Sequence, residues 1–486
     1  MRELKPNAIR LVMMRAREVD GIFSLGGGRP SEEIFPITAA SIQVNATSET
    51  DPPDVSGATA PLLTLDVPVP RMVMNYNGLT FSSGLPGLRT VLQKHMVKWH
   101  APPAKTWDLC VTSGTTDAIN KIVLLLTQPG DVIFSSEYCY TGILAGPVVQ
   151  GRDIVGIAMD SEGLLPDVLA ARCAQYAARG QLPRLLYLVP TGQNPTGCTL
   201  SVKRRKDIYA VCRKYDIFII EDDPYFFLQM PEYDPTASAT EAKFYDNLVP
   251  SFLSMDTDGR VVRLDSFSKI IAPGIRVGWM TGPPEIIKKV ATFSQITSWS
   301  ISGLPQSALL ALLEHWGEDG FERHIAYLQS YYIQRRDAIL RAMDKHLRNS
   351  ETGAAQDNDD HDDSDDRPVA RWSHPNAGMF VWIEVPGADT DGLIDLLMSE
   401  KVAVIPGSGF YAGLTPGPCP FFRATFAELD VEAYDEAIAR LARVLKRAEV
   451  ASKEEPKAVS SSPSYRRIGV LGALALGVAT LFANRE

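Results

Sequence analysis

Hydrophobic and polar positions follow two periods along the middle of the chain, one typical of helices and one typical of buried strands. Runs with the helical period occupy 88–99, 116–126, 165–178 and 202–215. Short apolar runs lie between them at 109–112, 131–135, 185–189, 217–220 and 261–264. This alternation predicts a mainly parallel sheet with helices on both faces. Ligands of such sheets bind at the carboxyl ends of the strands.

The pattern changes after residue 279. Helical runs occupy 283–295, 305–316 and 321–347. A smaller unit then mixes apolar segments at 378–384, 402–405 and 421–426 with helical runs at 391–399 and 431–447. The predicted fold class is α/β, with a large mainly parallel-sheet domain and a smaller α+β domain.

Shifts in composition set the expected boundaries. We expect an N-terminal arm at 1–30, a loop-rich insertion at 31–75, the large domain at 76–310, the small domain at 311–450 and a polar linker at 451–465. Inside the small domain, residues 351–367 are rich in acids and have the composition of a disordered loop.

The end of the chain predicts a membrane anchor at 466–484. Arg466 and Arg467 precede sixteen uncharged, mostly apolar residues at 468–483. As a helix these would span about 24 Å, somewhat less than the usual hydrocarbon core, and a short docked helix is the alternative. An anchor would hold the protein on the cytoplasmic face of an intracellular membrane, and without it we expect a cytoplasmic protein.

Composition excludes several classes of protein. With 45% hydrophobic and 22% charged residues, the 486-residue chain is globular. The net charge of -10 and the lack of a basic stripe argue against a nucleic-acid partner. The six cysteines have neither disulfide-framework nor metal-ligand spacing, so we expect no metal site and a thiol-reducing compartment.

The most informative chemistry lies at 262–279. Lys269 follows an apolar strand, with Ser266, Ser268 and Arg276 near it in sequence. A lysine in a partly dry, cation-rich pocket has a lowered pKa and can condense with a carbonyl. Hydroxyls and a guanidinium suit a phosphate monoester. The pattern predicts an aldehyde cofactor with a phosphate, such as pyridoxal 5'-phosphate (PLP), against the alternative of a lysine at an exposed strand end.

Two further segments follow predicted strands. Gly114, Thr115 and Thr116 open a helix, so they form an anion site or a plain helix cap. Tyr140, after the next strand, stacks on a planar cofactor or belongs to the core.

Four further polar residues are candidates for binding a ligand. The loop 189–197 presents the Asn194 amide, a donor suited to a phenolate oxygen. Asp222 ends an apolar strand, where it meets a cation such as a protonated pyridine nitrogen or lies in a solvated turn, and Tyr225 could reach the adjacent ring oxygen. Arg423 stands in apolar surroundings and needs a substrate carboxylate or a structural salt bridge.

Together these motifs resemble the class I and II aminotransferases of PLP fold type I, in particular the kynurenine, 2-aminoadipate and aromatic amino acid branch. The resemblance covers roughly residues 8–447. It rests on Ser-Leu-Gly-Gly-Gly-x-Pro at 24–30 with Phe35-Pro36, Gln-Asn-Pro-Thr-Gly at 193–197, Glu-Asp-Asp-Pro-Tyr at 221–225, Asp-Ser-Phe-Ser-Lys at 265–269 and Gly-Met-Phe-Val-Trp at 378–382.

The resemblance implies a role for each candidate. Lys269 would bond to the cofactor aldehyde and later move a proton, Asp222 would pair with the pyridine nitrogen, and Tyr140 would stack on the ring. Asn194 and Tyr225 would hold the ring oxygen, while Arg423 with Asn194 would bind the substrate α-carboxylate. A homodimer with shared active sites is also implied. The expected phosphate ligands are Gly114, Thr115, Thr116, Ser266, Ser268, Arg276 and Tyr76 of the partner subunit.

The chain departs from the family pattern at two places. Thr116 stands where relatives have an amide. Arg29 follows Gly28 where relatives have a leucine, and Arg10 lies in the arm. Gly28, Arg10 and Arg29 are therefore expected beside the substrate side chain, where the arginines would meet an acidic group or form a salt bridge within the protein.

The predicted function is transfer of an amino group between an L-amino acid and a 2-oxo acid such as 2-oxoglutarate. The amino acid would be aromatic, kynurenine, 2-aminoadipate or lysine-like. The cofactor motifs leave open another PLP reaction on the same fold, such as a carbon-sulfur lyase or a cyclase. A non-catalytic PLP-binding regulator is more remote, because the arm is too short for a DNA-binding domain.

Overall fold

The structure of the chain is a computed structural model, and it describes residues 15, 19–21, 23, 31–45, 62–69, 82–103, 106–236, 247–347, 369–413 and 417–454. Contacts divide the chain into a compact unit, Met1–Val444, and a second unit, Leu445–Glu486. The sheets and cavities described below belong to the first unit.

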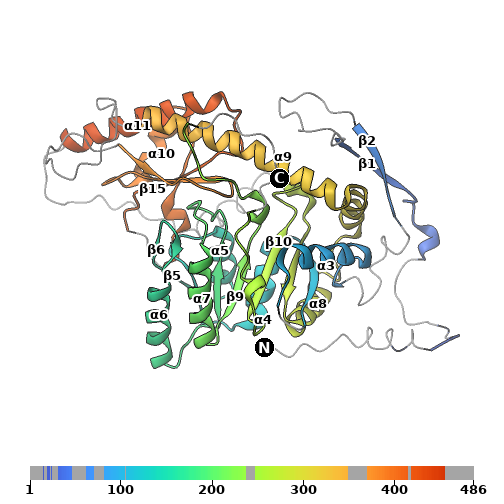
Figure 1. Ribbon diagram of the computed structural model, residues 1–486. Coiled ribbons are helices and arrows are strands. Elements are labelled where there is room, and N and C mark those ends of the chain that lie inside the picture. The colour runs from blue at the N-terminus through green and yellow to red at the C-terminus, as the bar shows by residue number, and fades with distance from the viewer. Residues whose placement is uncertain are drawn as a thin grey trace, which may run out of the picture. The chain divides into compact units, whose positions relative to one another are not determined.

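A seven-stranded sheet of the described residues forms the centre of the first unit (Figure 1), in the order β3-β11-β10-β9-β8-β4-β5. All neighbouring pairs are parallel except those of β11, which runs antiparallel to β10 and β3. The predicted mainly parallel sheet is therefore confirmed. Its strands are β3 (Asp108–Thr112), β4 (Val132–Ser136), β5 (Asp153–Ile157), β8 (Leu185–Leu188), β9 (Phe218–Asp222), β10 (Val261–Ser266) and β11 (Gly278–Gly282).

Helices cover both sides of this sheet, because the central strands are apolar on both faces. Strands β8 and β10 are buried along their whole length. In Figure 1, α6 and α7 lie to one side of β9, and α3 and α8 lie to the other side of β10. The helices are α3 (Pro86–His100), α4 (Thr115–Leu126), α5 (Thr141–Val149), α6 (Pro166–Ala178), α7 (Val202–Lys214) and α8 (Pro284–Thr297).

The two helical runs expected at 305–316 and 321–347 form one continuous element, α9 (Gly303–His346). It is two helices joined at a kink, where Gly317 has φ 60° and ψ -163°. A positive φ of this kind is open to glycine without steric cost, so the sequence break at this glycine marks the kink.

A smaller antiparallel sheet has the order β12-β13-β15-β14. The strand expected at 402–405 is reduced to Ile405–Pro406, and the helix expected at 391–399 begins as a 3-10 turn at Thr390. The elements here are β12 (Arg371–Trp372), β13 (Phe380–Glu384), α10 (Ile394–Ser399), β14 (Ile405–Pro406), β15 (Phe421–Thr425) and α11 (Ala433–Glu454).

Two short hairpins lie outside both sheets. β1 (Ala40–Asn45) pairs antiparallel with β2 (Leu62–Val67), and side chains along both strands alternate between more and less exposed. β6 (Met159–Asp160) pairs with β7 (Gly163–Leu164). The first hairpin lies inside the segment 31–75 that the sequence presented as loop-rich.

The predicted C-terminal membrane anchor is not supported. None of the helices in the described part of the chain is long and apolar enough to cross a membrane. Residues 466–484 themselves lie outside the described residues, and the sixteen apolar positions would reach only about 24 Å against a hydrocarbon core of about 30 Å. The anchor, and the membrane location that depended on it, are therefore withdrawn.

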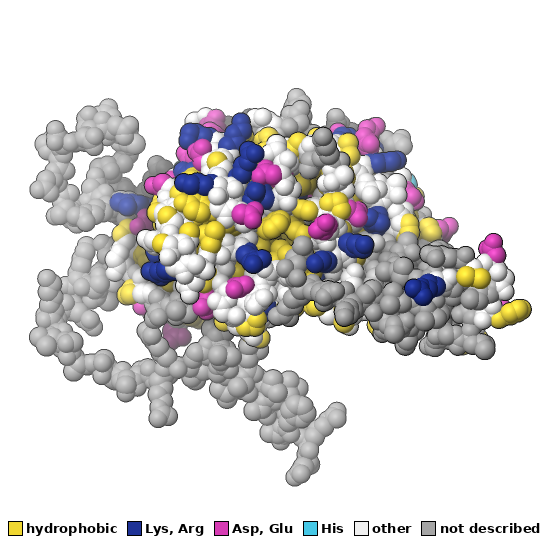
Figure 2. Space-filling view, turned by 90° about the horizontal axis from the view of Figure 1, so that it is seen from below, with side chains coloured by type: hydrophobic (Ala, Val, Ile, Leu, Met, Phe, Trp, Pro, Cys, Tyr) yellow, Lys and Arg dark blue, Asp and Glu magenta, His cyan; other side chains and the backbone are white. Residues whose placement is uncertain are grey.

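Charged side chains of both signs are interspersed with apolar ones on the face shown in Figure 2. Lysines and arginines stand next to acids there and do not gather in a stripe.

Candidate active site

A cavity of about 620 Å³ lies at the carboxyl edge of the large sheet. The strands that end there, β9 and β10, are parallel neighbours, and Asp222 pairs with Leu264 in their register. The same cavity is bounded on its other side by β13 and β15 of the small sheet. Eleven of the predicted site residues line it: Thr115, Thr116, Tyr140, Asn194, Asp222, Tyr225, Ser266, Ser268, Lys269, Arg276 and Arg423.

Lys269 has the environment that an amine nucleophile needs. It follows β10 and is half-buried at the floor of the cavity. Burial, together with the positive charges of Arg423 and Arg276, lowers the pKa of its amine. A larger fraction of this amine is therefore uncharged near neutral pH than for an exposed lysine.

A cup for an anion lies beside Lys269. Ser266 Oγ donates a 2.9 Å hydrogen bond to Ser268 Oγ, and Arg276 Nη1 donates to Ser268 Oγ at 3.3 Å. Arg276 Nη2 donates to the Ser113 carbonyl at 2.9 Å, which brings the guanidinium over the start of α4. Hydroxyls, a guanidinium and the free N–H groups of a helix N-terminus together suit a phosphate.

Gly114 makes this arrangement possible. Its φ is 92°, and a Cβ at this position would collide with the Arg276 guanidinium. Any other residue would both strain the backbone and push Arg276 away. Gly114 therefore lies beneath the cup and does not line the cavity itself. Thr116 Oγ1 and Tyr140 Oη, 3.5 Å apart, close the cup on the other side.

Asp222 lines the cavity, and one of its carboxylate oxygens has no hydrogen-bond partner among the described residues. Its side chain is buried, and Tyr187 Oη donates a 2.6 Å hydrogen bond to its Oδ2. Its Oδ1 is buried without a partner among the described residues. Burial raises the pKa of the Asp222 carboxyl to about 7, although the hydrogen bond from Tyr187 favours the ionised form. A protonated ring nitrogen would satisfy Oδ1, so this residue fits the PLP pyridine.

Tyr187 contacts the site through Asp222, and the sequence did not reveal this contact. It lies within β8 and is fully buried, so its sequence context is that of a core tyrosine. Burial raises the pKa of its phenol well above the ordinary value, with the Asp222 charge adding to the effect. Tyr187 therefore stays protonated and acts as the donor.

The neighbouring acids of Asp222 point away from the cavity. Because side chains alternate along a strand, Glu221 and Asp223 lie on the opposite side of β9. Arg263, which is fully buried, pairs there with Asp223 at 2.9 Å and with Asp265 at 2.8 Å, and Glu221 lies 3.2 Å from it. The run of acids is thus divided between a structural ion network and one carboxylate for a ligand.

Arg423 is a cation that forms no salt bridge with a described residue, although the Glu428 carboxylate lines the same cavity and favours the charged guanidinium. Its Nη1 donates a 2.9 Å hydrogen bond to Asn194 Oδ1, and its guanidinium lies 4.4 Å from the Phe380 ring and 4.9 Å from the Phe410 ring. No carboxylate of the described residues pairs with it, and its Nε is buried without a partner. Burial lowers the pKa of this guanidinium. The observed geometry therefore suits a ligand carboxylate better than the alternative of a structural salt bridge.

Tyr225 is buried at the edge of the cavity and packs edge-on against Phe380, with ring centroids 6.1 Å apart. Both Tyr225 and Asn194 line the cavity. The remaining candidates, Tyr76, Gly28, Arg10 and Arg29, lie outside the described residues.

Comparisons with known proteins agree on one family. The family described as aminotransferase class I and II matches residues 74–441. The chain is 35% identical over 458 residues to the mitochondrial kynurenine/alpha-aminoadipate aminotransferase of Mus musculus, covering 91% of this chain and 96% of that protein. It is also 35% identical over 452 residues to an aromatic amino acid aminotransferase of Schizosaccharomyces pombe, covering 87% and 91%.

Solved structures give the same picture. The aminotransferase Aro8 from Candida albicans superposes with a TM-score of 0.79 at 28% identity, covering 92% of this chain and 96% of that one. A kynurenine aminotransferase from Pyrococcus horikoshii superposes with a TM-score of 0.66 at 28% identity, covering 77% and 83%. The chain is thus similar in sequence and in fold to aminotransferases along most of its length.

Proposed function

Because the chain belongs to the family of class I and II aminotransferases and is a PLP-dependent enzyme, we propose that it transfers amino groups from an aromatic amino acid, kynurenine, 2-aminoadipate or a lysine-like amino acid to a 2-oxo acid. The acceptor would be 2-oxoglutarate or a similar acid. The single observation that carries this proposal is the unpaired Arg423 facing the same cavity as the half-buried Lys269. The Arg423 guanidinium would bind the α-carboxylate that all these substrates share. The Lys269 amine would act at the adjacent α-carbon.

The described residues would hold the cofactor from three sides. Asp222 Oδ1 would accept from the ring nitrogen, Ser266, Ser268 and Arg276 would bind the phosphate, and Tyr140 would cover the ring. When bound, PLP supplies an electron sink for the negative charge that develops at the substrate α-carbon. Asp222 supports this role because an ionised carboxylate keeps the ring nitrogen protonated.

Lys269 would provide the proton transfer. Lys269 Nζ would act as a base while a substrate amine occupies the site. Burial and two arginines lower the pKa of the Lys269 amine, so it can accept a proton from the substrate α-carbon. It would then donate this proton to the cofactor side of the bound substrate.

Arg423 and Asn194 would orient the substrate. Two N–H groups of a guanidinium match the two oxygens of a carboxylate, so this pair fixes the α-carbon relative to Lys269. Phe380 and Phe410 hold the guanidinium in place and keep water from it.

We also propose a homodimer with shared active sites, as the resemblance implies. Tyr76 of the partner subunit would complete the phosphate site. Gly28, Arg10 and Arg29 would lie beside the substrate side chain, where the arginines would favour a substrate with a second acidic group.

The half-reaction tests the proposal. The PLP form of the enzyme is mixed separately with L-phenylalanine, L-kynurenine, L-2-aminoadipate and L-lysine, and its visible absorption is followed. At least one of them should remove the absorption of the aldehyde form, and 2-oxoglutarate should then restore it with release of glutamate. If no amino acid does so while a sulfur amino acid yields pyruvate or sulfide, the enzyme is a lyase and the proposal is wrong.

A further inference from the structure

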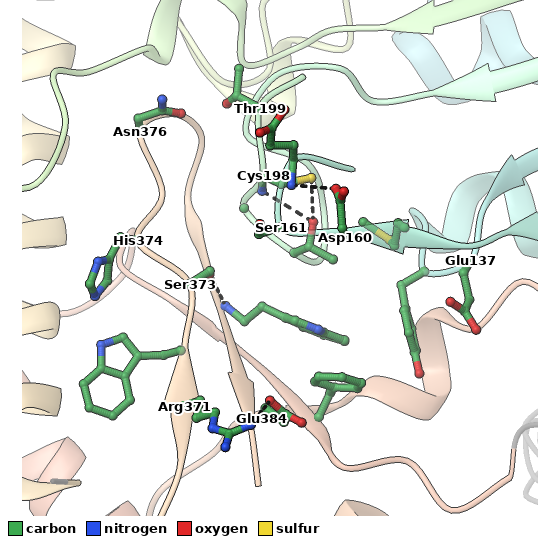
Figure 3. Close-up of a pocket in the computed structure, with 18 residues that line it drawn as sticks. Glu137, Asp160, Ser161, Cys198, Thr199, Arg371, Ser373, His374, Asn376 and Glu384 are labelled. Atoms are coloured by element: carbon green, nitrogen blue, oxygen red, sulfur yellow. Dashed lines mark hydrogen bonds and ion pairs between the residues drawn. The ribbon is translucent and has the colours of Figure 1, made fainter. Parts of the chain in front are cut away.

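A second cavity, of about 790 Å³, lies on the other side of the loop that carries Asn194. Neither Lys269 nor Asp222 nor Arg423 lines it. Its walls come from the segment after β4, the β6–β7 hairpin, the loop 196–199 and the strands β12, β13 and β15 (Figure 3). Its volume is within the range of about 300–1,000 Å³ that is typical of small-molecule sites.

Both cavities are lined by β13 and β15, and on each strand the residue that lines one cavity is two positions from a residue that lines the other. Side chains at i and i+2 on a strand point to the same face, so one continuous face of β13 and β15 passes from one cavity to the other. Tyr140, Phe380 and Arg423 line the first cavity, and Tyr138, Trp382 and Phe421 line the second.

These three aromatic side chains form one wall of the second cavity. Trp382 and Phe421 stack with their planes 16° apart and their centroids 5.1 Å apart. The Tyr138 ring centroid lies 5.3 Å from that of Trp382 and 5.4 Å from that of Phe421. All three rings are only half-buried, so part of their surface is open to a ligand. The negative faces of such rings attract cations.

Carboxylates surround this wall. Asp160 and Glu162 approach Arg204, at 2.9 Å and 3.6 Å, and Glu384 lies 3.8 Å from Arg371. Glu137, next to Tyr138, has no basic partner among the described residues. Figure 3 shows Glu137 at one side of the cavity and the Arg371–Glu384 pair across from it.

The indole N–H of Trp372 has no hydrogen-bond partner in the described part of the chain. Its Nε1 is buried, and Trp372 also lines the cavity. A buried donor of this kind is normally paired, so this part of the wall is left incompletely hydrogen-bonded.

We propose that this cavity is a second ligand site, which binds an organic ammonium ion that carries an aromatic ring. The ring would pack against Trp382 and Tyr138, and the ammonium group would face the Glu137 carboxylate. A metal ion is disfavoured, because the described residues contain no group of three histidines, cysteines or acids suited to one. An anion is disfavoured, because the four acids Glu137, Asp160, Glu162 and Glu384 outnumber the two arginines that approach them.

Benzyltrimethylammonium is the probe of choice, because a quaternary ammonium cannot condense with the cofactor aldehyde. It is titrated into the PLP-loaded enzyme by isothermal calorimetry, with and without saturating 2-oxoglutarate. The proposal predicts saturable binding that 2-oxoglutarate does not displace and that leaves the visible absorption unchanged. Benzyl alcohol should bind more weakly and benzenesulfonate should not bind. Equal binding of the anion, or no saturable binding of the cation, overturns the proposal.

Two substitutions locate the site. Glu137→Gln keeps the side-chain size but removes the charge, and should weaken binding about fivefold. Trp382→Leu removes the largest ring and should weaken it about tenfold. Glu285→Gln, an exposed position on α8, is the matched control and should leave the affinity unchanged. If Trp382→Leu fails to fold, Glu137→Gln decides alone. Wild-type affinity in Glu137→Gln contradicts the assignment.

Discussion

Arg423 Nη1 donates a 2.9 Å hydrogen bond to Asn194 Oδ1, joining β15 of the small sheet to the loop that follows β8 of the large sheet. This bond sets the orientation of a guanidinium that is half-buried between two phenyl rings and has no carboxylate partner among the described residues. A cation held in this way is costly unless an anion joins it. The pair is therefore organised for a carboxylate before any substrate arrives.

Replacing Arg423 should raise KM strongly and should leave the visible spectrum of the bound cofactor nearly unchanged. Loss of a charge-assisted pair in Arg423→Ala should cost about 2–3 kcal/mol, or roughly 30- to 150-fold in KM for both the amino acid and the 2-oxo acid. The KM of Arg423→Lys should lie between those of the wild type and Arg423→Ala, because an ammonium keeps the charge but lacks the planar guanidinium. Steady-state kinetics and the visible spectrum give the two readouts. Unchanged KM in Arg423→Ala, with the surface variant Arg179→Ala as control, would assign Arg423 a purely structural role.

Removing the Tyr187 hydroxyl should weaken the hold on the cofactor. In Tyr187→Phe the Asp222 carboxylate loses its donor, so its ionised form is less stable and pairs less well with a ring nitrogen. We expect about tenfold weaker PLP binding and an acidic limb of the kcat profile shifted to higher pH. Titration of cofactor-free protein with PLP measures the first effect. Tyr176→Phe is the control. If Tyr187→Phe matches this control in both PLP affinity and the kcat profile, the Tyr187 hydroxyl has no role beyond packing.

Asp222 should make the cofactor-free protein less stable as pH rises. Its folded pKa of about 7 exceeds the ordinary value of 3.8, so between these values the folded protein holds a proton that the unfolded chain releases. Stability contributed by this group therefore falls from about pH 4 to about pH 7. Cofactor-free Asp222→Asn should be more stable than the wild type at pH 8, by about 2–4 kcal/mol, and the gap should shrink towards pH 5.

Urea unfolding across this pH range measures the difference. With PLP bound the order should reverse, because the wild-type carboxylate then has a cationic partner and the amide does not. A difference that is independent of pH would mean that Asp222 is ionised throughout and that its burial has little effect.

The positions of Lys269 and Asp222 at or just after the ends of apolar strands predicted that both lie at one edge of the sheet, whereas the family resemblance alone joined Arg423 to them. Sequence patterns could not place Tyr187, since its contact depends on the register in which Leu188 pairs with Glu221. The Arg263 network was equally hidden, because the acids it pairs with come from two different strands. In contrast, the alternation in 40–45 and 62–67 is visible in the sequence and could have predicted the β1–β2 hairpin.

The second cavity illustrates the same limit. Trp382 lies in a segment that the family resemblance already singled out, yet its position beside Tyr138 follows only from the approach of two sheets. For the C-terminal tail, the apolar composition and the flanking arginines favoured an anchor although the run is somewhat short for a bilayer, and this prediction is not supported.

We propose Lys269 as the amine that binds the cofactor aldehyde. The most direct measurement is reduction of the PLP-loaded enzyme with borohydride, followed by digestion and mass spectrometry of every lysine-containing peptide. We expect a reduced pyridoxyl-phosphate adduct on Lys269 in the wild type, and loss of both the adduct and the visible absorption in Lys269→Ala. An adduct on another lysine in the wild type, or an unchanged visible band in Lys269→Ala, would contradict this assignment.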